Sequence, residues 1–393
     1  MNKVKYKQLS EACKYINTKI AIEKITLDNY ISTENMMPEK SGVAVAAKLP
    51  DSNSVPHYNE KDILTSNIRP YFKKIWFATN SGGCSNDVLI IRANKGNDSR
   101  FLYYALSDNN FFNYATVTSK GTKMPRCSKN AIMKYLIPDI TIENQKRIAD
   151  VLAQYDELIY SNNKKIDILL NIAEQIYREW FVRLRFPNYQ STHLEYGIPE
   201  GWTIMRIKDF GRVETGKTPP TVNPENYGGD IMFIKTPDMH GQTFVVETGE
   251  YLTEIGHSTQ PKKLLPAKSI SVSCIGTGGI VAINSEPAHT NQQINSIVLN
   301  DIKYLEWLYF TAKVLKPTIE MFGATGATMT NLSKGKFEKI KVICPSKELV
   351  YKYNQITSPM IEEIKELQKQ NLNLIKQRDL LLPRLMNGKL MTQ

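Results

Sequence analysis

Two stretches of the sequence repeat each other: GTKMPRCSKNAIMKYLIP at 121–138 and GATMTNLSKGKFEKIKVICP at 326–345. Matching residues keep a constant offset of 205 and include Gly121 with Gly326, Met124 with Met329, and Ser128 with Ser333. Two extra residues in the second copy are then expected to place Pro138 opposite Pro345. A period near half the chain length indicates duplication of a whole structural unit.

The repeat extends upstream of these stretches. EKDILTSNIRPYF (60–72) resembles PAKSISVSCIGTGGI (266–280), and each reads as a β-strand that ends in a turn. SNDVLIIRANKGNDSRFLYYAL (85–106) resembles NQQINSIVLNDIKYLEWLYFTA (291–312), a strand followed by a short amphipathic helix. Each copy is therefore predicted to be a β-rich domain.

A long helical stretch follows each copy, over 141–182 and 347–383. Apolar residues recur there at spacings of four and three, which is typical of a heptad seam. The alternative is that each seam packs only on its own domain. The central expected seam residues are Ile159, Asn162, Ile166 and Leu169 in the first helix and Ile364, Leu367, Asn371 and Leu374 in the second. A polar seam residue such as Asn162 or Asn371 usually sets the register of pairing at some cost in stability.

Four segments follow from these patterns and from the linker FVRLRFPNYQSTH (181–193). We predict a β-rich domain over 1–140, a long helix over 141–185, a second β-rich domain over 186–345 and a second long helix over 346–393. The predicted fold class is α+β, with the two helices paired as an antiparallel coiled coil. This pairing would relate the domains by an approximate two-fold axis.

GRVETGKT (211–218) has the letters of a nucleotide-binding phosphate loop. Such a loop lies between a buried strand and a helix whose first amide groups hold the phosphates. Here Pro219 and Pro220 follow Thr218 directly and remove amides where they are needed. We interpret the match as chance.

Other chemistries also lack support. The five cysteines form no CxxC pair and the five histidines form no HExxH or HxH motif, so no metal site is predicted. KTPPT (217–221) lacks the features of an adenine methyltransferase motif, and neither a GxSxG nucleophile nor a nuclease acid cluster is present. A net charge of +11 instead favours a polyanionic partner. The sequence also contains no signal peptide and no membrane-spanning run, so we expect a cytoplasmic protein with no membrane partner.

Several segments closely resemble the specificity subunit of Type I restriction–modification systems: NQKRIADVLAQYDELIYSNNKKIDILLNIAEQIYREWFVRLRF (144–186), YGIPEGWTIMRIKDFGRVETGKTPPT (196–221), the second copy of the repeat, and LLLPRLMNGKL (380–390). In that family two β-rich target recognition domains are separated by two long conserved helices. The first domain here lacks the Pro-x-Gly-Trp opening that the second has at 199–202.

The resemblance implies a non-catalytic subunit that reads an asymmetric, bipartite sequence in double-stranded DNA. It implies recruitment of two adenine methyltransferase subunits and of motor-endonuclease subunits. S-adenosylmethionine, ATP and Mg²⁺ would then bind those partners, and no cofactor would bind this chain. The alternatives are a free-standing DNA-binding or anti-restriction scaffold of similar architecture, and a stand-alone enzyme.

Candidate DNA contacts are basic and amide side chains in loops, because Lys and Arg contact phosphates while Gln, Asn, Arg and Lys can read base edges. In the first domain the candidates are Arg69, Tyr71, Lys73, Lys74, Lys120, Lys123 and Arg126. In the second they are Lys217, Thr218, Lys235, His240, Gln242, Asn291, Gln292, Gln293 and Thr328. The alternative for each is an ordinary solvated loop residue.

Overall fold

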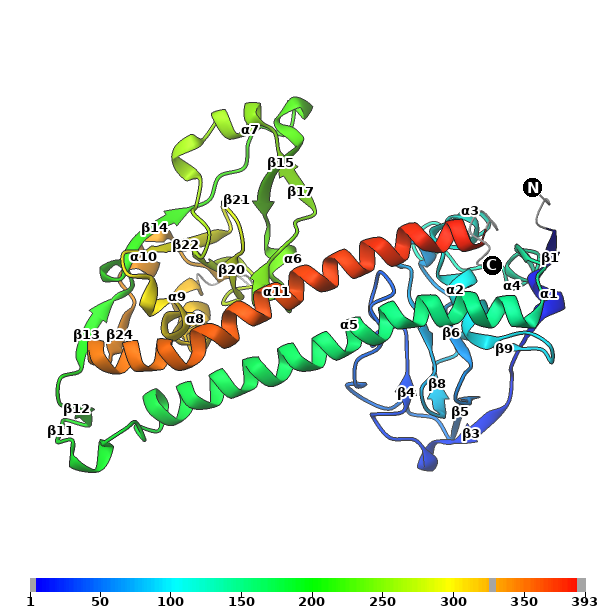
Figure 1. Ribbon diagram of the computed structural model, residues 1–393, viewed down its shortest axis with the longest axis horizontal. Helices are drawn as coiled ribbons and strands as arrows, with labels where there is room; N and C mark the ends of the chain where they lie inside the picture. Colours follow the sequence, from blue (N-terminus) through cyan, green and yellow to red (C-terminus); the bar gives the residue numbers. More distant parts are fainter. Residues whose placement is uncertain (1–4, 325–329, 387–393) are drawn as a thin grey trace. The chain divides into compact units, whose positions relative to one another are not determined.

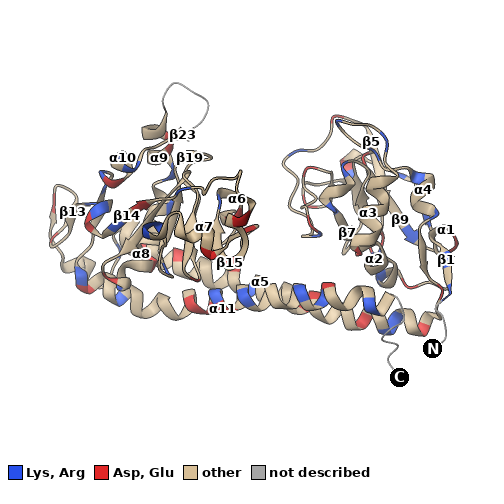
Figure 2. Cartoon of the chain, turned by 90° about the horizontal axis from the view of Figure 1, so that it is seen from above, with Lys and Arg blue, Asp and Glu red and all other residues tan. Residues whose placement is uncertain are grey.

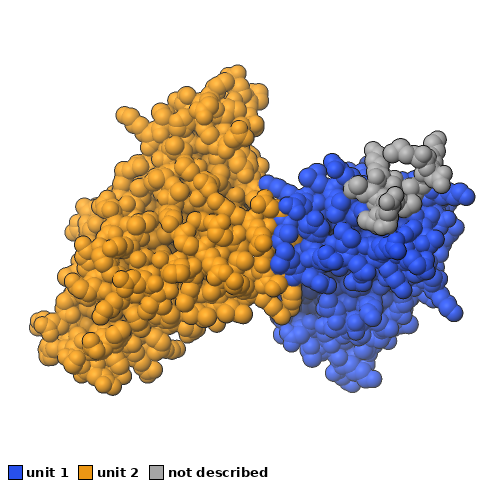
Figure 3. Space-filling model, in the orientation of Figure 1, with its two compact units in different colours: residues 1–158, 374–393 blue, residues 159–373 orange. Residues whose placement is uncertain are grey.

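The computed structural model describes residues 5–324 and 330–386. The chain forms two compact units, residues 1–158 with 374–393 and residues 159–373 (Figure 3). Each unit combines a β-rich body with segments of two long helices, α5 (Ile142–Tyr177) and α11 (Lys347–Met386), as Figure 1 shows. The predicted α+β class, with β-rich bodies and long helices alternating along the chain, is confirmed.

The first unit is built on two four-stranded sheets. The main sheet has the order β2-β9-β6-β7 with every neighbour antiparallel, and the other has the order β3-β5-β8-β4. Their strands are β2 (Cys13–Tyr15), β3 (Lys19–Ala21), β4 (Tyr30–Ile31), β5 (Ser54–Tyr58), β6 (Ile63–Ser66), β7 (Ile75–Phe77), β8 (Gly82–Cys84) and β9 (Val88–Ala93).

Strand β9 is apolar on both faces because it separates two cores. Leu89 and Ile91 join the core formed with α2 (Ser99–Ser107) and α3 (Asn109–Val117). Val88 and Ile90 point to the opposite face and join a second core. A central strand covered on both sides therefore reads as a continuous hydrophobic run.

The second unit repeats this plan. Its main sheet has the order β14-β22-β18-β20-β16 and its other sheet the order β17-β15-β21. Their strands are β14 (Gly211–Thr215), β15 (Tyr227–Ile234), β16 (Phe244–Val245), β17 (Glu250–Leu252), β18 (Ile270–Ser273), β20 (Val281–Asn284), β21 (Ala288–Thr290) and β22 (Ile294–Leu299). Helix α8 (Leu305–Val314) follows β22 as α2 follows β9, and its Trp307 lies in the core.

The duplication extends to strand register and to individual hydrogen bonds. Ile63 lies opposite Ile91 in the first unit, and Ile270 lies opposite Ile297 in the second. The matched main-chain hydrogen bonds are Asn67 N–H to Asp87 O (2.8 Å) with Cys274 N–H to Gln293 O (2.8 Å), and Cys127 N–H to Asn67 O (2.9 Å) with Leu332 N–H to Cys274 O (2.9 Å). The two bodies are therefore equivalent residue by residue around these loops.

The predicted two-residue insertion at the end of the repeat is wrong. A ribbon of β1 (Tyr6–Gln8) and β10 (Leu136–Pro138) pairs Tyr6 with Pro138. The corresponding ribbon of β13 (Thr203–Arg206) and β24 (Lys341–Cys344) pairs Ile204 with Ile343. Pro138 is thus equivalent to Ile343 and not to Pro345, because strand pairing continues at the offset of 205 and the shared proline is not a register marker.

The two long helices pair in antiparallel fashion, as predicted. In the second unit the Asn162 amide donates to the side-chain oxygen of Asn371 at 2.9 Å, and both residues are buried. In the first unit Arg378 donates to Asp156 at 2.5 Å. The seams also pack on the β-rich bodies: Ile364 is part of the second unit's core, and Ile166 packs against it. Pairing and packing on the domain therefore occur together.

The other predicted seam residues are buried or half-buried. Leu169 packs against the core of the second unit and Leu367 is buried, while Ile159 and Leu374 are half-buried. Helix α5 ends in a π-helical turn, Arg178–Val182. Among the described helices, none has the length and apolarity required to cross a membrane.

Candidate nucleic-acid interface

In the first unit, strand pairing joins the two candidate segments into one surface. Ile68 forms a β-bridge with Arg126, and the Arg69 N–H donates to the Pro125 carbonyl at 2.8 Å. Arg126 in turn exchanges main-chain hydrogen bonds with Lys120 at 2.8 and 2.9 Å. The exposed candidates on this surface are Arg69, Tyr71, Lys120, Lys123 and Arg126.

The ammonium groups of Lys73 and Lys74 already have protein partners, as the Arg126 guanidinium has in its ion pair with Asp87 at 3.0 Å. Lys73 pairs with Glu39 at 2.9 Å, and Lys74 donates to the Thr33 carbonyl at 2.7 Å. Burial, and then the neighbouring positive charge of Arg69, lower the pKa of Lys74. Lys74 therefore serves first to hold the loop, and Arg69 is the more available cation.

Arg69 has a left-handed backbone conformation, with φ 49°. The β-bridge of Ile68 with Arg126 corresponds in the second unit to the pairing of Ile275 with Asn331, so Arg69 is equivalent to Gly276. Gly276 has φ 82°, which glycine adopts without strain because it has no Cβ atom. A non-glycine residue in this conformation costs of order 1 kcal/mol, and such strain is concentrated at functional sites. Lys61 and Lys73 of the same unit share this left-handed backbone, so the strain alone does not distinguish Arg69.

In the second unit, the candidates at 217–218 and 291–293 meet at the ends of neighbouring strands. The Lys217 N–H donates to the Thr290 carbonyl at 2.9 Å, and the Thr218 hydroxyl donates to the Gln292 side chain at 2.5 Å. Gln292 and Lys217 are exposed, while Asn291 is buried. The structure thus brings together an amide and an ammonium group that can face a ligand.

Gln293 is half-buried and bonded within the protein. Its side-chain oxygen accepts from Asn291 at 3.2 Å and from Thr236 at 3.4 Å, and its N–H donates to Asn291 at 3.1 Å. Gln293 therefore positions the loop that carries Gln292.

The remaining candidates are distributed differently. Lys235 forms an ion pair with Glu250 at 2.6 Å, and His240 is exposed at the end of α6 (Thr236–Met239). Gln242 accepts a hydrogen bond from Gln368 of α11 at 2.5 Å, so it contacts the helix and not the 217–292 junction. Thr328 lies outside the described residues.

The phosphate-loop interpretation fails on main-chain geometry. The first five residues of GRVETGKT, Gly211–Thr215, form strand β14, and no helix follows Thr218 directly. The N–H groups of Gly216 and Lys217 donate to the carbonyls of Ile294 and Thr290 at 3.1 and 2.9 Å. Since these amides are used within the sheet, they are not available to a phosphate.

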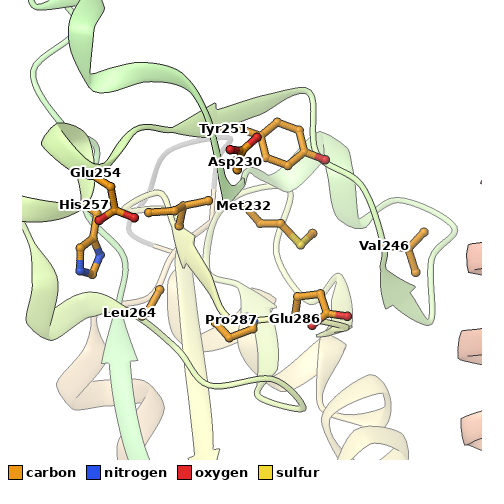
Figure 4. Close-up of a pocket in the computed structure, with 10 residues that line it drawn as sticks. Asp230, Met232, Val246, Tyr251, Glu254, His257, Leu264, Glu286 and Pro287 are labelled. Carbon is orange, nitrogen blue, oxygen red and sulfur yellow. The ribbon is translucent and has the colours of Figure 1, made fainter.

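A cavity of about 530 Å³ in the second unit has the wrong charge for DNA. Figure 4 shows Asp230, Glu254 and Glu286 among its lining residues, with Glu254 beside His257 on α7 (Glu254–Ser258). Three carboxylates would repel a phosphate backbone. The interface is therefore built on the loop surfaces and not on this cavity.

His257 and His289 are in contact, although no sequence motif pairs them. Their ring nitrogens Nδ1 and Nε2 lie 2.9 Å apart, and His289 is fully buried. Burial, and then His257, lower the pKa of His289 to about 4. In the part of the chain that the structure describes, no group of three or more His, Cys, Asp or Glu side chains could hold a metal ion.

The long helices carry both signs of charge. Figure 2 shows Lys and Arg interspersed with Asp and Glu along α5 and α11. Several are paired, for example Lys165 with Glu363 at 2.5 Å. This mixed surface lacks the single-sign field that favours a phosphate backbone, in contrast to the loop surface around Arg69 and Lys120.

Comparison with known proteins identifies a family whose description names DNA. The family model described as the Type I restriction modification DNA specificity domain matches residues 1–171 and again 199–377. The chain belongs to this family. The specificity subunit of the HindI Type I restriction enzyme from Haemophilus influenzae is 31% identical, over 84% of this chain and 86% of the relative. The MjaIX specificity subunit of Methanocaldococcus jannaschii is 27% identical, over 74% of this chain and 69% of the relative.

The fold of this specificity subunit is shared with a solved structure of a Type I restriction–modification S subunit from M. genitalium. The two superpose with a TM-score of 0.60 at 16% identity, over 98% of this chain and 97% of the other. The loops described above are thus parts of a DNA-recognition subunit.

The candidates from the sequence omitted one segment of this specificity subunit. Because Asp87 is equivalent to Gln293, the preceding Asn86 is equivalent to Gln292. The signal was present in the alignment of SNDV (85–88) with NQQI (291–294), which places Asn86 opposite Gln292. Asp87 is paired with Arg126 at 3.0 Å.

Proposed function

We propose that this specificity subunit reads an asymmetric, bipartite DNA target, with one half-site for each β-rich domain. The observation that carries the proposal is that equivalent positions on a common main-chain framework present different side chains. Arg69 is matched by Gly276, and Asp87 by Gln293. Similar frameworks support two similar docking modes, while unlike side chains select unlike bases.

The two kinds of contact have separate roles. Lys120, Lys123 and Lys217 are exposed ammonium groups that suit phosphate oxygens, which fix register without carrying sequence information. Gln292 presents a neutral amide that can pair with both polar atoms of an adenine edge. Arg69, as a planar fork, suits a guanine edge.

We also propose that the helices recruit two methyltransferase subunits, which in turn allow motor-endonuclease subunits to join. Ile168 and Ile172 of α5 are 59% and 41% exposed in the second unit and lie one turn apart on the same helix face. An exposed aliphatic pair on a helix that is otherwise paired suits an apolar helix of a partner. In this proposal the chain itself is non-catalytic, and S-adenosylmethionine, ATP and Mg²⁺ bind the partners.

Methylation-site mapping tests the target. Cells that carry this chain with the methyltransferase subunits should show adenine methylation at one asymmetric motif made of two parts with a constant spacer. A palindromic motif, or no sequence-specific methylation, would contradict the proposal.

Co-purification tests the assembly. We expect two methyltransferase subunits for each copy of this chain by native mass spectrometry. A chain that binds specific DNA but never captures a methyltransferase subunit would instead be a free-standing DNA-binding scaffold.

A further inference from the structure

We infer that the first domain reads a base through Asn86, with Lys19 and Lys129 holding the adjacent phosphates at a small cavity beside it. None of these three residues was a candidate from the sequence. The inference rests on the proposed function and deepens it, because it names the side chains that would specify the first half-site. It is carried by the equivalence of the two units, by the lining of the cavity and by the free polar groups of the residues.

Lys19 and Lys217 follow matched strand residues by the same number of positions. Tyr15 lies opposite Ile91 in the first unit, as Val213 lies opposite Ile297 in the second. Lys19 follows Tyr15 by four residues, and Lys217 follows Val213 by four residues. Asn86 is thus equivalent to Gln292, while Lys19 in β3 lies opposite Pro56 and Lys217 bonds to Thr290.

The cavity provides the second observation. It has a volume of about 180 Å³, and both Lys19 and Asn86 line it, together with Lys129, Asn17 and Tyr15. Its lining contains two lysines and neither an aspartate nor a glutamate. The charge is therefore opposite to that of the acidic cavity in the second unit, and it suits the phosphate oxygens of a DNA backbone.

The polar groups of this site are available to a ligand. Asn86 and Lys19 are exposed. Among the described residues, neither the Asn86 amide nor the Lys19 ammonium group has a hydrogen-bond or ion-pair partner. The Lys129 ammonium lies 5.8 Å from the centre of the Tyr15 ring, which holds it at the cavity without neutralising it.

The chemistry of the three residues sets the expected ligand. An asparagine amide can donate to N7 and accept from the N6 amino group of adenine, and it matches that base edge in the major groove. The two lysines are point charges suited to phosphate oxygens. The site is therefore expected to select adenine at one position of the first half-site.

The test uses the full chain assembled with its methyltransferase subunits, and measures methylation motifs and binding to duplexes of the mapped target. Asn86→Ala should reduce discrimination at one base pair of the first half-site by about 5- to 150-fold and leave the second half-site unchanged. Asn86→Asp should move the preference at that position from adenine toward cytosine, because a carboxylate accepts from the cytosine amino group. Lys19→Ala should lower the affinity for every duplex by the same factor. It should also reduce the magnitude of the slope of log affinity against log salt concentration by about 0.9.

Asn59→Ala is the matched control, since Asn59 is an exposed asparagine in the same unit and does not line the cavity. If Asn86→Ala and Asn86→Asp both keep the wild-type motif, as Asn59→Ala should, the inference is wrong while the proposed function stands. If the wild-type complex showed no sequence-specific methylation, the proposed function itself would be wrong. A motif change confined to the second half-site would also overturn the inference.

Discussion

At the scale of single residues, Arg69 combines backbone strain with an available guanidinium group. Arg69→Gly should raise the free energy of unfolding of the first unit by up to about 1 kcal/mol, because glycine adopts φ 49° without strain. The same variant should weaken binding to the target duplex by at least several-fold, since it removes a proposed base contact. Urea unfolding and duplex titration measure the two effects.

Lys61→Gly is the control for Arg69→Gly. Lys61 also has a left-handed backbone, with φ 69°, and its exposed side chain is not a candidate contact. It should show the gain in stability without the loss of DNA affinity. If Lys61→Gly weakened DNA binding as much as Arg69→Gly, strain relief and not the guanidinium would explain the loss.

A second residue-scale prediction concerns His289. Burial, and then the neighbouring His257, lower the pKa of this side chain to about 4. The unfolded chain binds a proton near pH 6.5, whereas the folded chain does so only near pH 4, so the unfolded state binds more protons between these values. Stability of the second unit should therefore be full above about pH 6.5 and fall as the pH drops toward 4. His289→Gln should flatten this part of the profile, as measured by urea midpoints at pH 7 and 5; an unchanged slope would assign it to other groups.

At the scale of elements, the two faces of α5 should separate folding from recruitment. Ile166 packs against the core of the second unit, while Ile168 is 59% exposed. Ile166→Asp should destabilise that unit by several kcal/mol, because it leaves an unpaired charge in an apolar contact. Ile168→Asp should leave the urea midpoint unchanged and abolish methyltransferase co-purification. Equal loss of stability in both variants would contradict the assignment of the two faces.

The long helices were predictable because a heptad pattern sustained over many turns has few alternative interpretations. The pairing of strands next to the candidate loops was harder to predict from the sequence. Ile68 and Arg126 form a bridge across a long sequence separation, and sequence periodicity gives no distance information of that kind. The alignment error at Pro138 has the same origin, because strand pairing and not residue identity sets the register there.

At the scale of the whole molecule, duplication explains what the sequence revealed. The repeat predicted two similar β-rich bodies, and matched hydrogen bonds at Asn67 and Cys274 confirm their equivalence. Asn86 is equivalent to Gln292 and both are amides, so the repeat carried a signal at this position. The cavity that brings Lys19 and Asn86 together depends on tertiary contacts, which sequence periodicity does not show.

The final prediction is that the two domains read DNA independently. Asn86 and Gln292 belong to different compact units and share no hydrogen-bond partner in the described chain. Gln292→Ala should relax only the second half-site, and Asn86→Ala only the first, each by about 1–3 kcal/mol. In a double-mutant cycle on one duplex, the two losses should add to within about 0.5 kcal/mol, as is typical of sites without shared partners. A coupling energy above about 1 kcal/mol would show instead that one domain adjusts the other, and that the bipartite target is read as a single unit.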